Sequence, residues 1–208
     1  MKATKTLTFI LTISLCSIFS CSKKEEITNT NKQVKNETDH NSASFNIENI
    51  PVSNVNFSEF GEFPHIGIPE NVKFTNSPLE NETGEIYFPI GKKNDFVKLT
   101  GKTFKAFLSK KDNDTKDWSV EEITQNFDDN IKKLGGVLIF NGKLTNEQTD
   151  YLNNNDKTLG EEGSIDYWNE PVRVYAIRSA KGDNIYVQLS LNSASGAIQI
   201  LQEKSKNK

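Results

Sequence analysis

One segment near the middle of the chain has the spacing of an amphipathic helix, and strand-like segments lie on both sides of it. Between residues 119 and 134, apolar residues recur three or four positions apart: Val120, Ile123, Phe127, Ile131 and Leu134. Ser119, followed three residues later by Glu122, predicts a capping box, and Gly135-Gly136 end the pattern. We therefore predict a helix over residues 119–134.

The flanking segments predict a sheet. Short apolar or alternating runs bounded by turn residues cover 85–90, 95–109, 137–140, 172–178, 185–191 and 197–203. Residues 172–178 are apolar on both parities, which predicts a central strand, and 137–140 predict a buried one. Because the links are short, we predict an α+β domain over residues 61–203. It would be an antiparallel β-sheet of about five or six strands with one main helix packed on one face, followed by a disordered tail at 204–208.

Two local features refine this order. In the run 95–109, Val97 and Leu99 share one parity, whereas Phe104, Ala106 and Leu108 share the other. A one-residue bulge at Gly101 would place both sets on the same face. Thr145, with Gln148 three residues later, predicts a short second helix that reaches Leu152.

The start of the chain has the pattern of a secretory signal. Lys2 and Lys5 precede an apolar run over residues 7–19, whereas a membrane-spanning helix needs about 20 apolar residues. The sequence Ile18-Phe19-Ser20-Cys21 follows and resembles the bacterial lipobox, in which a small residue precedes the cysteine that is lipidated. Phe19 is larger than the residue usual at its position. This resemblance implies a signal peptide over residues 1–20 and cleavage between Ser20 and Cys21.

A second cysteine, Cys16, is the alternative lipidation site, but Leu15 before it is large where a small residue is needed. Cleavage before Cys21 would remove Cys16. The mature chain would then hold one cysteine, joined to lipid, and no disulfide or thiolate nucleophile would remain. The lipid would convert a soluble chain into a membrane-anchored one.

The residues after Cys21 indicate in which membrane the protein lies and how its domain is tethered to the lipid. Ser22 differs from the Asp that resembles an inner-membrane retention signal, so we expect the outer membrane. The charged cluster 23–26 resembles the surface-export signal of Bacteroidetes lipoproteins, but it equally suits the start of a solvated tether. Hence the side of the membrane, periplasmic or cell-surface, stays open. Residues 21–60 are predicted to be a lipidated disordered tether, because 22–44 are nearly all polar. The apolar residues between 45 and 60 leave open an extended segment that docks on the domain.

The composition excludes several functions. With 25 Lys and Arg against 28 Asp and Glu, the net charge is −3, which argues against nucleic-acid binding. His40 and His65 are the only histidines and neither has a partner at ligand spacing, so we expect no metal and no cofactor. The acidic run at 112–114 predicts a polar hairpin and not a calcium loop, since Asp117 stands where the loop glycine belongs. No catalytic set is evident.

One loop is a candidate for recognition. Tyr167-Trp168 lies in the polar stretch 153–170 before Pro171, and aromatic residues on a loop can stack on sugars or on a protein partner. The sequence favours the other interpretation, in which Trp168 folds back and covers the sheet.

Short motifs along residues 63–203 resemble the domain found ahead of the peptidoglycan-binding module in some OmpA-family envelope proteins. They are Phe63-Pro64-His65-Ile66-Gly67-Ile68-Pro69, Tyr87-Phe88-Pro89-Ile90-Gly91, Val97-Lys98-Leu99-Thr100-Gly101-Lys102, Lys133-Leu134-Gly135-Gly136, Val172-Arg173-Val174-Tyr175-Ala176-Ile177 and Ile185-Tyr186-Val187-Gln188. The resemblance implies a fold and an envelope location, but no site. No counterpart of the peptidoglycan-binding module follows, so peptidoglycan binding is not expected.

Together these patterns predict a lipid-anchored cell-envelope lipoprotein that acts as a binding or structural module for a protein or a glycan, without catalytic activity. The alternative is a secreted lipoprotein hydrolase, which needs two carboxylates that converge in a cleft. The sequence leaves the partner and the oligomeric state open.

Overall fold

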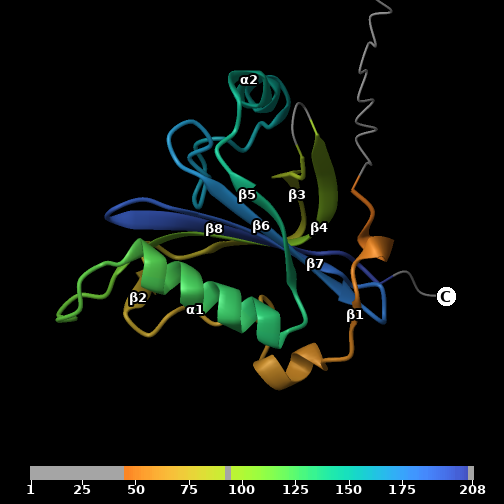
Figure 1. Ribbon diagram of the computed structural model, residues 1–208, viewed down its shortest axis with the longest axis horizontal. Coiled ribbons are helices and arrows are strands. Elements are labelled where there is room, and N and C mark those ends of the chain that lie inside the picture. Colours follow the sequence, from red (N-terminus) through yellow and green to blue (C-terminus); the bar gives the residue numbers. More distant parts are fainter. Residues whose placement is uncertain (1–44, 92–94, 206–208) are drawn as a thin grey trace, which may run out of the picture. The chain divides into compact units, whose positions relative to one another are not determined.

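The computed structural model of the protein describes residues 45–91 and 95–205 (Figure 1). The predictions for the signal peptide, Cys16, Ser20, Cys21, the tether up to residue 44 and His40 lie outside these residues. The described residues contain two α-helices, α1 (Val120–Lys133) and α2 (Asn146–Asn155), and two short 3₁₀ helices, η1 (Ile47–Asn49) and η2 (Phe57–Phe60). Neither α-helix of the described part has the length and hydropathy of a membrane span.

Eight strands of the described residues form one curled sheet. They are β1 (Val52–Ser53), β2 (Val72–Phe74), β3 (Leu79–Pro89), β4 (Phe96–Lys110), β5 (Val137–Gly142), β6 (Val172–Ser179), β7 (Ile185–Leu191) and β8 (Ser195–Gln202). The order is β1-β6-β7-β8-β4-β2; β3 also pairs with β4, and β5 also pairs with β6. All pairs are antiparallel except β1 with β6.

The α+β class is confirmed, but the sheet is mixed and richer in strands than the five or six antiparallel ones predicted. The additional strands β1 and β2 span only two and three residues, too few to show an alternating pattern. Strand β6 is central, as predicted. Strand β5, predicted to be buried, lies at an edge with the side chain of Leu138 exposed.

Both faces of the sheet are covered, and each face has its own core. The first core lies between the sheet and α1 and includes Ile123, Phe127 and Ile131 of that helix (Figure 1). The second core lies on the opposite parity of the same strands and includes Leu152 of α2 and Tyr167. Every residue of β7 is therefore buried, since its alternate side chains enter different cores.

The predicted bulge at Gly101 is wrong. Strand β4 pairs with β8 without interruption from Lys102 to Ser109, and the register shift near this point lies in β3, between Asn81 and Gly84. The change of parity has another cause. Val97 and Leu99 pack on the second core, whereas Phe104, Ala106 and Leu108 belong to the first. Glycine is needed at 101 for close approach, because a Cβ there would lie 2.1 Å from the carbonyl oxygen of Gln202.

Both helices begin at the predicted caps. The Ser119 hydroxyl accepts a hydrogen bond from the Glu122 amide at 3.2 Å, which is one half of the predicted box. In α2 the box is complete, since Thr145 Oγ1 accepts from the Gln148 amide and Gln148 Oε1 accepts from the Thr145 amide. Helix α2 continues past Leu152 to Asn155.

Residues 45–60, here called the docking segment, lie against the domain. Ile50 and Phe57 are buried, and β1 adds to the edge of β6. Arg178 on β6 donates hydrogen bonds to the carbonyl oxygens of Glu48 (2.9 Å) and Ile50 (3.2 Å). The packed domain therefore starts near residue 45 and not near 61. Of the two arrangements that the sequence left open for this stretch, the structure contains the docked one.

Candidate functional site

The structure separates the two aromatic residues of the candidate recognition loop. Asp166 Oδ1 accepts hydrogen bonds from the backbone amides of Trp168 (3.2 Å) and Asn169 (3.1 Å), which fixes a tight turn. Tyr167 points inward and is 2% exposed, whereas Trp168 is 46% exposed. Hence the favoured prediction that Trp168 covers the sheet is wrong: Tyr167 covers it, and Trp168 is exposed to solvent on a well-defined turn.

Beneath this loop, three polar side chains form a row across neighbouring strands. Lys105 pairs with Gln199, and Gln199 pairs with Gln188. Gln188 Nε2 donates to the Tyr167 hydroxyl at 2.8 Å and to Gln199 Oε1 at 2.7 Å, and Gln199 Nε2 donates to the carbonyl of Gly163 at 2.9 Å. Burial raises the pKa of Tyr167, so the phenol stays protonated. The loop is thus fastened by hydrogen bonds as well as by apolar packing.

Lys105 is an unusual member of this row, because its side chain carries an ionisable group into the interior. The residue is 3% exposed, and its ammonium donates to Thr158 Oγ1 at 2.9 Å. That hydroxyl in turn donates to Asp156 Oδ1 at 2.8 Å. Burial lowers the pKa of Lys105, since a charge is poorly solvated there. This row could not be predicted from the sequence. Lys105 and Gln188 each alternate with apolar residues along their strands, so their parity predicted a face turned toward solvent.

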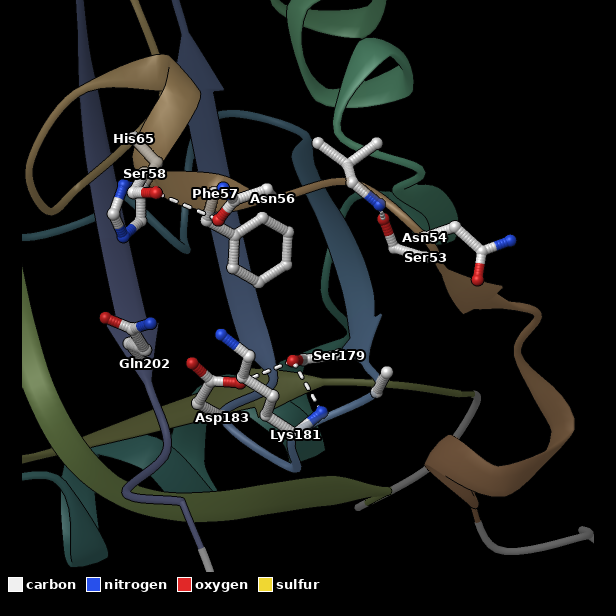
Figure 2. Close-up of a pocket in the computed structure, with 12 residues that line it drawn as sticks. Ser53, Asn54, Asn56, Phe57, Ser58, His65, Ser179, Lys181, Asp183 and Gln202 are labelled. Carbon is white, nitrogen blue, oxygen red and sulfur yellow. Dashed lines mark hydrogen bonds between the residues drawn. The ribbon is translucent and has the colours of Figure 1, made fainter.

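A pocket lies at the other end of β6, between the docking segment and the turn that joins β6 to β7 (Figure 2). Its volume is about 510 Å³. Figure 2 shows the Phe57 ring and His65 above the cavity, Gln202 at one side, and Lys181 and Asp183 below. The lining residues are Ser53, Asn54, Val55, Asn56, Phe57, Ser58, His65, Ser179, Ala180, Lys181, Asp183 and Gln202. We call it the strap pocket.

His65 has a fixed position in the strap pocket. Its Nδ1 lies 2.8 Å from the carbonyl oxygen of Gly61, so this nitrogen carries the proton of the bond and Nε2 is the acceptor of the neutral ring. The backbone of His65 has a φ of 64°, a conformation that residues other than glycine rarely adopt. The ring is half-buried and tilted against Phe57, with centroids 5.8 Å apart. From the sequence we predicted only that His65 has no partner at ligand spacing. Its position in the wall of a pocket was not predicted.

The turn below the pocket is braced by its own hydrogen bonds. The Ser179 hydroxyl donates to Asp183 Oδ1 and accepts from the Lys181 amide at 3.1 Å, and the Ser179 amide donates to Asn184 Oδ1 at 2.9 Å. Lys181 and Asp183 therefore extend from a backbone with a defined shape. Together they bring one positive and one negative charge to the strap pocket.

A second pocket, of about 470 Å³, lies on the surface near the start of α1. It holds three carboxylates, those of Glu70, Asp114 and Glu122, with Lys111 and Lys116 beside them. Asp114 belongs to the acidic run predicted to be a polar hairpin, and it accepts a hydrogen bond from the Lys116 amide at 2.8 Å. Within residues 45–91 and 95–205, no three His, Cys, Asp or Glu side chains are grouped as metal ligands.

Asp128 on α1 has a partner across the first core. Both its carboxylate oxygens accept from one nitrogen, Nη2 of Arg173 on β6, at 2.9 and 2.8 Å, and the Tyr175 hydroxyl donates to Asp128 Oδ1. Hydrogen bonds between charged groups of this kind are stronger than those between neutral groups. The cluster fastens α1 to the central strand.

No known protein-family model matches the chain, and no curated protein is significantly similar to it. The resemblance to the domain of OmpA-family envelope proteins therefore stays a prediction.

Proposed function

We propose that the protein is a lipid-anchored lipoprotein of the cell envelope, held at the outer membrane by lipid on Cys21, and that residues 45–205 act as a binding or structural module. The observation that carries the proposal is the sequence Ile18-Phe19-Ser20-Cys21 directly after a short apolar run. Two or three acyl chains on one cysteine would make release from the membrane negligible, because each buried methylene adds about 0.8 kcal/mol.

Two features of the domain support a binding role. Trp168 is a large apolar side chain held in solvent by the Asp166 turn, and such rings stack on sugars or on partner proteins. The strap pocket is a concave surface with both polar and apolar lining at the opposite end of β6. Both features suit recognition of an envelope protein or a glycan.

Anchoring is tested by changing the proposed lipid site. Cys21→Ala should abolish incorporation of labelled palmitate and release the protein from the membrane fraction. Cys16→Ala is the matched control, since Cys16 would leave with the signal peptide, and it should label like the wild type. If Cys21→Ala still labels and sediments with membranes, anchoring through Cys21 is disproved.

The second candidate function is a lipoprotein hydrolase, and the surface pocket with Glu70, Asp114 and Glu122 is the observation that favours it. A screen with chromogenic glycosides and esters tests it. Hydrolysis that Glu122→Gln abolishes and Glu121→Gln leaves intact would establish the enzyme and displace the binding role.

A further inference from the structure

The charged groups of the strap pocket limit the class of ligand that it can bind. Lys181 and Asp183 are its charged groups apart from the His65 imidazole, and their charges cancel. A phosphate or other strong anion would meet Asp183 as well as Lys181, and a cation would meet Lys181 as well as Asp183. Much of the exposed lining is apolar, but nine of the twelve lining residues have polar side chains, and a wholly apolar ligand would leave their polar groups without partners. The pocket therefore favours an uncharged polar ligand.

The hydrogen-bonding groups of the pocket match hydroxyl groups. Amides such as those of Asn56 and Gln202 both donate and accept, as sugar hydroxyls do, and Asp183 can accept from hydroxyls while Lys181 donates to them. In the described part of the chain, neither the Gln202 amide nor the Lys181 ammonium hydrogen-bonds to another group. Figure 2 shows the Lys181 ammonium directed into the space beneath Phe57. These groups are thus available to a ligand.

Two rings supply an apolar surface next to these polar groups. Phe57 and His65 lie at the same wall, and the hydrogen bond from Nδ1 to Gly61 together with the positive φ holds His65 in one orientation. A non-glycine residue with positive φ is a strained feature of the kind that clusters at functional sites. A pyranose ring has an apolar C–H face and a rim of hydroxyls, and an aromatic wall beside polar groups is complementary to both.

We propose that the strap pocket binds a neutral oligosaccharide. This inference deepens the proposed binding function and rests on it. Since residues 53–58 form one wall and the 179–183 turn forms the other, a bound sugar bridges the docking segment and the sheet. A ligand that binds only the docked state stabilises that state. Sugar binding is therefore coupled to the attachment of the segment that leads to Cys21.

The test uses the full lipoprotein in a detergent without a sugar headgroup. The probes are neutral trisaccharides of glucose, mannose, galactose, xylose and N-acetylglucosamine, each at about 1 mM, where weak sites are populated. Inorganic phosphate and trialanine are the probes of other classes. Saturation-transfer NMR detects binding and calorimetry measures the affinity. We expect at least one trisaccharide to bind, and phosphate and trialanine not to compete with it.

A matched pair of variants locates the site. The double variant Lys181→Ala with Gln202→Ala should weaken sugar binding about tenfold or more, because it removes a charged and a neutral hydrogen bond. The control, Lys143→Ala with Gln125→Ala, changes the same residue types at exposed positions outside the pocket and should bind like the wild type. Thermal unfolding followed by circular dichroism shows whether both variants fold.

Hydrogen exchange gives a readout that does not depend on these variants. The bound sugar should slow amide exchange in residues 53–58 and leave the 156–170 loop unchanged. The inference is overturned if no trisaccharide binds, if both double variants bind equally, or if phosphate or trialanine occupies the pocket instead. Because labelling at Cys21 is measured separately, loss of sugar binding with intact anchoring would reject this inference alone.

Discussion

The hydroxyl of Ser53 joins two parts of the chain that are far apart in the sequence. It donates to the carbonyl oxygen of Leu134 at 2.7 Å, where α1 has ended and this carbonyl has no partner within the helix. Gly135 follows with a φ of 80°, and a Cβ there would lie 2.7 Å from the Ser53 hydroxyl. A glycine that ends the helix thus also makes room for the hydroxyl that caps it.

Replacing Ser53 tests this bond. Ser53→Ala should lower the free energy of unfolding by about 1–2 kcal/mol, since a buried carbonyl loses its donor. Urea denaturation measures the change. Ser58→Ala is the control, because that hydroxyl is exposed and donates to the Asn56 side chain, and it should change stability by less than about 0.5 kcal/mol. Equal effects of the two variants would contradict the role of Ser53.

Lys105 makes stability depend on pH. Burial lowers its pKa in the folded state below the ordinary value of 10.5, so the unfolded chain holds a proton more tightly than the folded one. Between the lowered pKa and 10.5, the unfolded state binds more protons, and stability therefore rises with pH. Below that window the charged Lys105 is destabilising.

Lys105→Met should accordingly stabilise the protein at pH 7, by on the order of 1 kcal/mol. The gain should shrink as the pH is raised through the window toward 10.5. Urea midpoints at several pH values for wild type, Lys105→Met and the exposed control Lys143→Met measure it. A difference between wild type and Lys105→Met that is constant over this range would show that Lys105 does not titrate with a lowered pKa.

A few buried side chains hold the docking segment against the domain. The short helix η2 contains one buried and one exposed phenylalanine. Phe57 is 9% exposed and belongs to the first core, whereas Phe60 is 42% exposed. Apolar residues recur between 45 and 60 without a period, so neither a helix nor a strand is predicted from them. Only their positions on the folded sheet decide which ones are buried.

Two phenylalanine variants separate these positions. Phe57→Ala should lower the free energy of unfolding by about 3 kcal/mol, because it leaves a cavity in the first core. Phe60→Ala should cost less than about 1 kcal/mol, since that ring is largely solvated already. Denaturant unfolding measures both. Similar values for the two would mean that the docking segment is not packed as described.

The two cores belong to one sheet, so the domain should unfold as a unit. Strand β4 sends Phe104 into the first core and Val97 into the second, and β7 contributes to both along its length. Loss of either core exposes the same strands. We therefore expect one cooperative transition.

The two tryptophans report on opposite faces and make this testable. Trp118 packs on the first core, and Trp168 stands next to Tyr167 of the second. In the single-tryptophan variants Trp118→Phe and Trp168→Phe, the fluorescence transitions should coincide. Leu152→Ala, in the second core, should shift both by about 3 kcal/mol. A transition seen by only one tryptophan would show that the cores unfold separately.

Local sequence patterns predicted where helices and strands lie better than they predicted which faces of these elements are buried. The helix caps at Ser119 and Thr145 and the central strand β6 follow from residues a few positions apart, and all three are present. The bulge at Gly101 was predicted wrongly because both faces of β4 are packed, and its apolar residues therefore need not share one face. The strap pocket could not be predicted, since its walls come from residues 53–65 and 179–202.

The sequence alone determined the α+β class, the helix ends and the lipoprotein prediction, because capping, periodicity and the residues before Cys21 act over short stretches of chain. The tertiary structure decided that both faces of the sheet are buried, that Trp168 and not Tyr167 is exposed, and that His65 meets Lys181 and Asp183 around one cavity. These outcomes depend on which distant segments share a face, and the periodicity of a single strand carries no information about what covers it.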